Sequence, residues 1–447
     1  MNLFNISKSK NIKFLTHICL GLVIVFFNYE LAYPIKPNTA KNHPIEAVLK
    51  PKINKKTTKA KSNKVASNKI FEAVEHLHQY SQVDPGQFPN KNDFIPISDL
   101  KLGVILVSAF FNQDQIWNTI IYAIRSNFLD GCMDPNHSFQ ECYSFPSEFK
   151  KSNFTLVNKK LFAYFNKNRI TQTHELISQD IYDIAFEDFK AAILNEEGID
   201  CLLSVRGGYG AAKMLNQFYQ IRKPSKEKLL IGYSDVTALH LFLSQEWNWK
   251  TIHGPMLKSF SEEDVKAKNF SQDNMRKLIL LLASKKPVKI NIGLVPVNDL
   301  AHNARCIKGV VTGGNASIIQ NSIGTKWQIN SGEKILIMED TGLPYYQVDR
   351  LMLHLKQAKI FDKVSAVILG VFDNSRSGVS NLNIKEFEAL AKIINVPVFI
   401  TDRIGHGRYN YPFIVNLEGG VFRNKDGHFI FEQIYQNPFN KTKVLKP

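Results

Sequence analysis

Short apolar runs, each ending at a turn-forming or charged residue, recur from the middle of the chain to its end. Three of them cover residues 201–205, 229–232 and 334–338. Apolar positions at helical spacing follow the last run, at Val348, Leu351, Met352 and Leu355. Because strands and helices alternate in this way, the pattern predicts an α/β fold with a parallel sheet.

The segment Leu229–Leu243, LLIGYSDVTALHLFL, predicts a strand, a sharp turn and an apolar helix. A turn of this kind exposes the hydroxyl of Ser234 and directs the next backbone N–H, that of Asp235, toward a developing oxyanion. The alternative is a helix cap, in which the side chain of either residue accepts a backbone N–H. The usual G-x-S-x-G pattern is incomplete, so this segment alone favours the cap.

A glycine-rich turn, RGGYG at 206–210, follows the strand at 201–205. Paired glycines let the backbone come close to a ligand. A phosphate cradle is one interpretation, but the Lys-Ser/Thr ending of a phosphate loop is missing. We expect this turn to supply the second half of an oxyanion hole.

Two further strand ends carry an acid and a base. The strand at 334–338 delivers Glu339 and Asp340, and GHG places His406 between two glycines after another apolar run. Open α/β sheets build their sites at the carboxyl ends of strands, so serine, carboxylate and histidine together predict a catalytic triad. A turn histidine is the alternative for His406, and His253 in HGPM is a rival base.

These segments resemble the LD-carboxypeptidase family of serine peptidases, which also contains the microcin-immunity hydrolases. The matching segments, in consistent order over about residues 99–420, are RGGYG (206–210), LIGYSDVTALH (230–240), HGPM (253–256), GGNAS (313–317), ILIMED with PYYQVDR (335–350) and GHG (405–407). The resemblance to its LD-carboxypeptidase branch implies Ser234 as nucleophile, Glu339 as orienting acid and His406 as base. It implies the backbone N–H groups of Asp235 and Gly207 as oxyanion donors, with no cofactor and no metal.

The resemblance also implies the substrate: a peptidoglycan stem peptide in which a terminal D-alanine follows the L-centre of a diamino acid. The free carboxylate needs a cation or a cluster of N–H groups. Arg206 is the candidate because it adjoins the expected oxyanion turn and because a guanidinium can donate two hydrogen bonds to a carboxylate. A structural salt bridge is the alternative. Tyr209 either lines the groove or packs under the loop. This chain departs from the family in two places: Leu343 stands where family members often carry a glutamate, and the stretch 408–413 after GHG usually reads differently. Both lie near the expected substrate groove.

The composition fits a sizeable enzyme, with 447 residues and 44% hydrophobic content. We expect a Rossmann-like parallel-sheet domain with the nucleophile and a smaller C-terminal α/β domain with Glu339 and His406. The expected divisions are a signal peptide or anchor at 1–33, a tether and lead-in at 34–98, the nucleophile domain at 99–257, a linker at 258–304 and the second domain at 305–447. The active site should lie where the domains meet.

The amino terminus predicts export to the periplasm or cell envelope. Lys8, Lys10 and Lys13 precede the apolar run 14–27, which is too short for a comfortable membrane span and is typical of a signal peptide. Residues 36–69 hold ten lysines and one acid, a balance of +9 within the chain's +16. Most of the net positive charge therefore comes from a predicted disordered tether, and it does not indicate a nucleic-acid groove. The tether either contacts anionic envelope polymers or lipids, or is a solvated spacer.

Cys132 and Cys142 flank a loop, and in an exported protein a disulfide is the expected form. Together with His137 they are too few for a four-ligand metal site. Cys201 and Cys306 are expected as small core residues. Dimers are common in the family, which allows a homodimer.

Two other functions remain open beside the carboxypeptidase: an immunity-type hydrolase of peptidyl or aminoacyl nucleotide antibiotics, and a non-catalytic envelope-binding homologue. The PYYQVDR segment at 344–350 favours the carboxypeptidase branch over the immunity branch. Expected export also argues against a cytosolic nucleotide-linked toxin. A pure binding protein has no need of serine, glutamate and histidine together.

Overall fold

The computed structural model describes residues 82–84, 102–105, 116, 154–168, 179–194, 198–261, 271–373 and 382–438. All of them belong to one compact unit. The predictions for the signal or anchor, the tether and the Cys132–Cys142 disulfide lie outside the described residues. Within the described ranges, no helix is long and apolar enough to cross a membrane.

A six-stranded sheet carries the serine turn. Its strand order is β12-β6-β5-β4-β2-β3, and every pairing is parallel except that of β12 with β6. Its strands are β2 (Leu102–Ile105), β3 (Phe154–Leu156), β4 (Cys201–Ser204), β5 (Leu229–Gly232), β6 (Thr251–His253) and β12 (Phe413–Val415). The strands β4 and β5 are buried at every position, as expected for parallel strands covered on both faces. The predicted Rossmann-like sheet is thereby confirmed.

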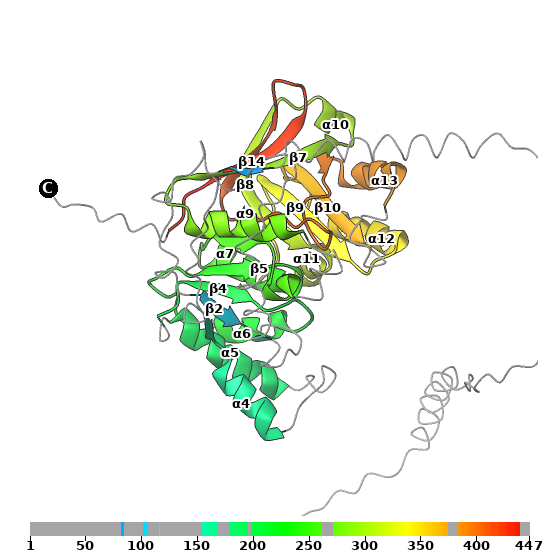
Figure 1. Cartoon of the computed structure of the whole chain (residues 1–447). Coiled ribbons are helices and arrows are strands. Elements are labelled where there is room, and N and C mark those ends of the chain that lie inside the picture. Colours follow the sequence, from blue (N-terminus) through cyan, green and yellow to red (C-terminus); the bar gives the residue numbers. More distant parts are fainter. Residues whose placement is uncertain are drawn as a thin grey trace, which may run out of the picture. The chain divides into compact units, whose positions relative to one another are not determined.

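Helices accompany this sheet. They are α4 (Lys159–Asn168), α5 (Gln179–Ile193), α6 (Leu215–Phe218) and α7 (Thr237–Glu246), with 3-10 turns η7 (Ala211–Met214), η8 (Ser234–Val236) and η9 (Leu257–Phe260). The helices α4 and α5 lie side by side (Figure 1), and Asp188 of α5 accepts the backbone N–H of Leu161 at the start of α4 at 2.9 Å. The helix α7 is buried from Thr237 to Ser244, which explains its nearly continuous apolar sequence.

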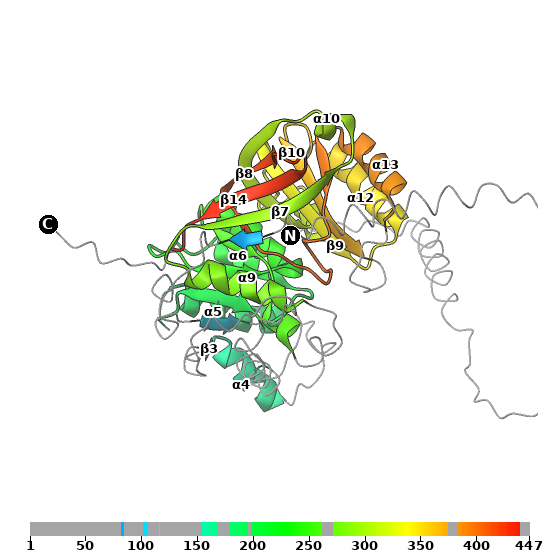
Figure 2. The same cartoon turned by 45° about the horizontal axis from the view of Figure 1, so that its top comes forward.

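An eight-stranded sheet carries the acid and the histidine loop. Its order is β1-β7-β11-β10-β9-β8-β13-β14, and a further pairing of β14 with β7 closes it into a barrel; Figure 2 shows β14 alongside β7. Its strands are β1 (Gln82–Asp84), β7 (Val288–Pro296), β8 (Cys306–Asn315), β9 (Lys334–Thr341), β10 (Ala366–Asp373), β11 (Val398–Ile400), β13 (Glu418–Arg423) and β14 (Phe429–Tyr435). The strands β8 to β11 are mutually parallel.

The second group of helices comprises α9 (Gln272–Ala283), α10 (Asp299–His302), α11 (Ala316–Ser322), α12 (Tyr345–Gln357) and α13 (Ile384–Ile394). Pro344 caps α12, whose buried positions are the four predicted from their spacing. The helices α12 and α13 lie together beside β9 and β10 in Figure 1. An asparagine capping box, with Asn383 and Glu386, starts α13.

Two segments cross the expected division of the chain. The stretch 258–304, expected as a linker, contributes β7 to the barrel, because Val288, Ile290 and Ile292 alternate with polar residues and bury one face. Conversely, β12 comes from the carboxyl-terminal part but pairs with β6. Cys201 is buried as expected, whereas Cys306 is exposed because it begins β8 at a solvent-facing position.

Candidate active site

Ser234 lies on a strained turn directly after β5. Tyr233 is still extended, at φ −149°, and Ser234 then takes φ +63° before the chain enters η8 and α7. A positive φ is uncommon for a residue with a Cβ and costs about 1–3 kcal/mol. The serine is half-buried, and its side chain does not cap the following helix. The cap interpretation of Ser234 is therefore wrong.

The glycine-rich turn after β4 packs against this serine. A Cβ added to Gly207 would lie 2.8 Å from Ser234 Oγ, so only glycine lets this backbone approach the hydroxyl so closely. The carboxylate of Asp235 accepts the backbone N–H of Ala211 at 2.8 Å. The side chain of Asp235 thus ties the two turns together, and it does cap a neighbouring turn.

Glu339 and His406 form a hydrogen-bonded pair. Glu339 is fully buried in β9, and its Oε2 accepts Nδ1–H of His406 at 2.6 Å. The His406 side chain keeps 16% of its exposure. Gly405, at φ +110°, makes the contact possible, since a Cβ there would lie 2.8 Å from the same carboxylate oxygen.

Glu339 and His406 shift each other's pKa. Burial alone would raise the pKa of Glu339, but His406 and His253 lower it to about 2. Burial alone would lower the pKa of His406, but Glu339, with Asp340 and Asp373, raises it above its ordinary value. The carboxylate therefore stays ionised at neutral pH and holds the imidazole with its proton on Nδ1, which leaves Nε2 for proton transfer.

The serine turn and the histidine loop meet at Tyr233. Its ring lies against the His406 ring, with centroids 4.8 Å apart. Both Ser234 and His406 are among the described residues, and no hydrogen bond joins their side chains. Catalytic hydrogen bonds often lengthen in the absence of substrate. The structure thus brings the serine turn next to the Glu339–His406 pair, but the hydrogen bond between Ser234 and His406 is not formed.

The helix α9 pins the histidine loop. Asn274 is fully buried, and its side chain donates to Arg408 O at 3.0 Å and accepts the Asn410 backbone N–H at 2.9 Å. Asn410 Oδ1 in turn accepts the N–H of Gly405 at 3.3 Å. The sequence singled out neither asparagine, because Asn274 is more than 130 positions away from the loop residues that it bonds.

A hydrogen-bonded bridge joins the two sheets beside the site. Thr237 Oγ1, at the start of α7, accepts the N–H of Asn315 at 2.9 Å. The Asn315 side chain donates to Asp340 at 3.0 Å, and Asp340 also accepts from Ser317. Since Asp340 follows Glu339, the bridge fixes the nucleophile helix relative to the strand that carries the acid. The GGNAS motif was its only signal in the sequence.

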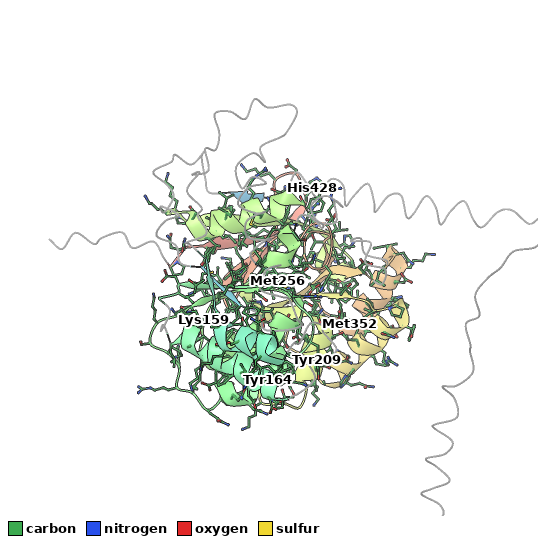
Figure 3. The ribbon with its side chains drawn as sticks, turned by 60° about the horizontal axis from the view of Figure 1, so that its bottom comes forward. Lys159, Tyr164, Tyr209, Met256, Met352 and His428 are labelled. Carbon is green, nitrogen blue, oxygen red and sulfur yellow. The ribbon has the colours of Figure 1, made fainter. Side chains whose placement is uncertain are left out.

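The two expected substrate-binding residues differ in exposure. Arg206 is half-buried, and among the described residues no acid or hydrogen-bond acceptor pairs with its guanidinium, so the structural salt bridge is absent there. Tyr209, which is labelled in Figure 3, does not pack under the loop. Its exposed fraction is 69%. The ammonium of Lys213, which the sequence analysis did not single out, lies 5.2 Å from the Tyr209 ring centroid and 4.5 Å from that of Tyr182.

The described residues contain no group of three or more His, Cys, Asp or Glu that could hold a metal ion. A serine on a strained strand-to-helix turn beside a buried carboxylate–imidazole pair is the arrangement typical of enzymes that catalyse acyl transfer through a serine. Fold and site together define the class of serine hydrolases.

Comparisons with known proteins narrow this class. The LD-carboxypeptidase N-terminal domain model matches residues 149–254, and the C-terminal domain model matches residues 308–421. A Rickettsia prowazekii protein whose name places it among the carboxypeptidases is 40% identical over 248 residues, 55% of this chain and 75% of that protein. The murein tetrapeptide carboxypeptidase of Pseudomonas aeruginosa is 28% identical over 232 residues, 50% and 74% of the two chains.

Solved structures share the fold. The muramoyltetrapeptide carboxypeptidase of Oxalobacter formigenes superposes with a TM-score of 0.52 at 17% identity, covering 76% of this chain and 99% of the other. The microcin-immunity protein MccF bound to glutamyl sulfamoyl guanosine gives 0.54 at 19% identity, covering 77% and 98%. The chain belongs to the LD-carboxypeptidase family, as its motifs indicated, and it is a serine carboxypeptidase.

Proposed function

We propose that the protein releases the terminal D-alanine from peptidoglycan tetrapeptides. The family and the relatives named for murein tetrapeptides support this substrate. One observation supports the chemistry most: the buried Glu339–His406 pair, bonded at 2.6 Å, lies beside the strained turn of Ser234.

In this mechanism Ser234 Oγ attacks the carbonyl carbon of the scissile amide while His406 Nε2 accepts its proton. Glu339 stabilises the imidazolium that forms. The N–H groups of Asp235 and Gly207 stabilise the tetrahedral oxyanion. His406 then protonates the leaving amine of D-alanine, and water hydrolyses the acyl-enzyme with His406 as base.

Arg206 is proposed to bind the free carboxylate of the terminal D-alanine. Its guanidinium, which has no partner among the residues that the structure describes, stands one residue before Gly207, on the turn that contacts Ser234. Replacing it with alanine should raise KM about tenfold or more, and Arg206→Lys should recover part of the loss. Arg222→Ala, which removes an exposed arginine, is the matched control and should leave KM unchanged. An unchanged KM in Arg206→Ala would reject this role.

Mass spectrometry of purified muropeptides tests the proposal. Wild-type protein should remove one D-alanine from tetrapeptides and leave the tripeptide, and Ser234→Ala should not. If the folded wild type leaves tetrapeptides intact, the proposed function is wrong. Aspartyl sulfamoyl adenosine, which a structure of MccF contains, should remain uncleaved; its cleavage with intact tetrapeptides would favour the immunity-type function.

The same proposal places the enzyme in the periplasm or envelope, on the basis of the basic and apolar pattern of residues 8–34. Fractionation of cells that produce the full chain should recover it outside the cytoplasm. Recovery from the cytoplasm alone, with its first residue intact, would contradict export.

A further inference from the structure

A second histidine faces the acid from the opposite side. His253 ends β6 and is fully buried, with its ring stacked on Phe413 at a centroid distance of 4.6 Å. Its Nε2 lies 3.6 Å from Glu339 Oε1. His253 was the rival base in the sequence, but here it contacts the acid and is sealed from solvent, whereas His406 remains partly exposed.

The two carboxylate oxygens of Glu339 differ in their hydrogen-bond partners. Oε2 accepts the proton of His406, while Oε1 is buried and has no hydrogen-bond partner among the described residues; the two ring nitrogens of His253 are in the same position. A separation of 3.6 Å is an electrostatic contact, and a shift of a few tenths of an ångström converts it into a hydrogen bond. Buried carboxylate oxygens left unpaired are costly.

We propose that His253 is a positioning residue that directs Nε2–H at Glu339 Oε1 and thereby holds the carboxylate in line with His406. This inference rests on the proposed serine mechanism. The aromatic contact with Phe413 restricts the His253 ring. Each oxygen of Glu339 then faces one histidine: Oε2 faces His406, which transfers the proton, and Oε1 faces His253, which stays in place.

The charges around the site give the direction of the pH effect. The groups that face the pair are His253, Asp340, Asp373 and Tyr233. Behind His253 lies His240, bonded through Nε2 to Gly232 O at 2.9 Å; burial lowers its pKa to about 3, so it is neutral.

The Glu339–His406 pair is negative when the imidazole is neutral and uncharged when it is protonated. A donor on Oε1 stabilises the negative form. Without His253, protonation becomes easier and the pKa of the pair rises.

The experiment compares His253→Leu, which removes the donor, with His253→Gln, whose amide can replace it. For His253→Leu we expect kcat for D-alanine release to fall about tenfold, and the acid limb of kcat/KM to move up by about one pH unit. His253→Gln should recover most of both. His240→Leu is the matched loss of a buried imidazole without a Glu339 contact; it should lower the unfolding temperature without moving the acid limb.

Titration of the His406 ring by NMR in the full chain gives the same shift without a substrate. A wild-type titration curve in folded His253→Leu would overturn the positioning role, whatever the activity. If tetrapeptides are not cleaved but the ring titration shifts as expected, the proposed function fails and the positioning role stands.

Discussion

The two sheets hold the proposed catalytic groups in different ways. On the six-stranded sheet, Ser234 is held by backbone geometry alone, at φ +63°, against a glycine turn. On the barrel, Glu339 and His406 are held by side-chain hydrogen bonds, and α9 fixes the loop that carries the histidine. Ser234 has a strained backbone and its side chain has no hydrogen bond to the other described residues, whereas Glu339 and His406 are joined to each other by a hydrogen bond of 2.6 Å.

This difference suggests a division of roles. In the proposed mechanism the strained serine attacks the substrate, while the Glu339–His406 pair keeps one tautomer and one orientation. The Thr237–Asn315–Asp340 bridge connects the two arrangements, so their spacing depends on a few hydrogen bonds.

The largest expected effect comes from the nucleophile. Ser234→Ala and Ser234→Gly should both lower kcat about 10⁵-fold or more, because no other hydroxyl replaces Oγ. They should differ in stability: glycine adopts φ +63° without strain, so Ser234→Gly should unfold with a free energy about 1 kcal/mol higher than Ser234→Ala. Denaturant titration measures this difference, and equal stabilities would mean that the turn stores no strain.

Next comes the acid. Glu339→Gln should lower kcat/KM about 10³- to 10⁴-fold, because the amide no longer stabilises the imidazolium. The pKa of His406 should fall, since burial still lowers it and the carboxylate that raises it is gone. NMR titration of the His406 ring checks the shift. An unchanged pKa would show that Glu339 does not control this histidine.

A smaller effect is expected from a substitution at Gly405, where the histidine loop packs closely against Glu339. Gly405→Ala would place a Cβ 2.7 Å from that of Glu339 at φ +110°, so we expect kcat to fall about 100-fold and stability by about 2–3 kcal/mol. Gly427→Ala is the matched control, at φ +86° in the hairpin beside His428 (Figure 3), with no atom within 4 Å.

Gly427→Ala should cost about 1 kcal/mol and no activity. Similar kcat values for the two variants would show that the close packing of Gly405 against Glu339 is not needed for activity.

The bridge gives the smallest of these effects. Thr237→Val keeps the shape but removes the acceptor for Asn315 N–H, so kcat should fall about tenfold and stability by about 1–2 kcal/mol. Thr251→Val is the matched control, because the buried hydroxyl of Thr251 has no partner among the described residues. That control should be neutral or stabilising. Equal effects of the two variants would show that this hydrogen bond does not contribute to catalysis.

Local patterns predicted much of this arrangement. The strands next to Arg206, Ser234 and Glu339 are short apolar runs that end at a turn-forming or charged residue, and such runs can be recognised from the sequence alone. The rule that parallel strands end at one edge of a sheet brought the turns of Arg206 and Ser234 together, whereas Glu339 lies at the end of a strand of the other sheet.

Long-range pairing was not predictable in the same way. The strand β7 joins the barrel and β12 joins the other sheet through partners far away in the sequence, so nothing local identifies them. The contact of His253 with Glu339 has the same origin, since it depends on how two sheets pack. The unusual backbone of Ser234 was foreseen as a sharp turn, but its φ of +63° was not.

A double-substitution experiment tests most directly whether groups from the two sheets act as one catalytic unit. Steady-state kcat for D-alanine release would be measured for Ser234→Ala, His406→Ala and the combined variant. We expect the combined variant to lose no more activity than Ser234→Ala alone, because in the proposed mechanism the histidine acts only through the serine. Losses that multiply would show that the two side chains act independently and would contradict it.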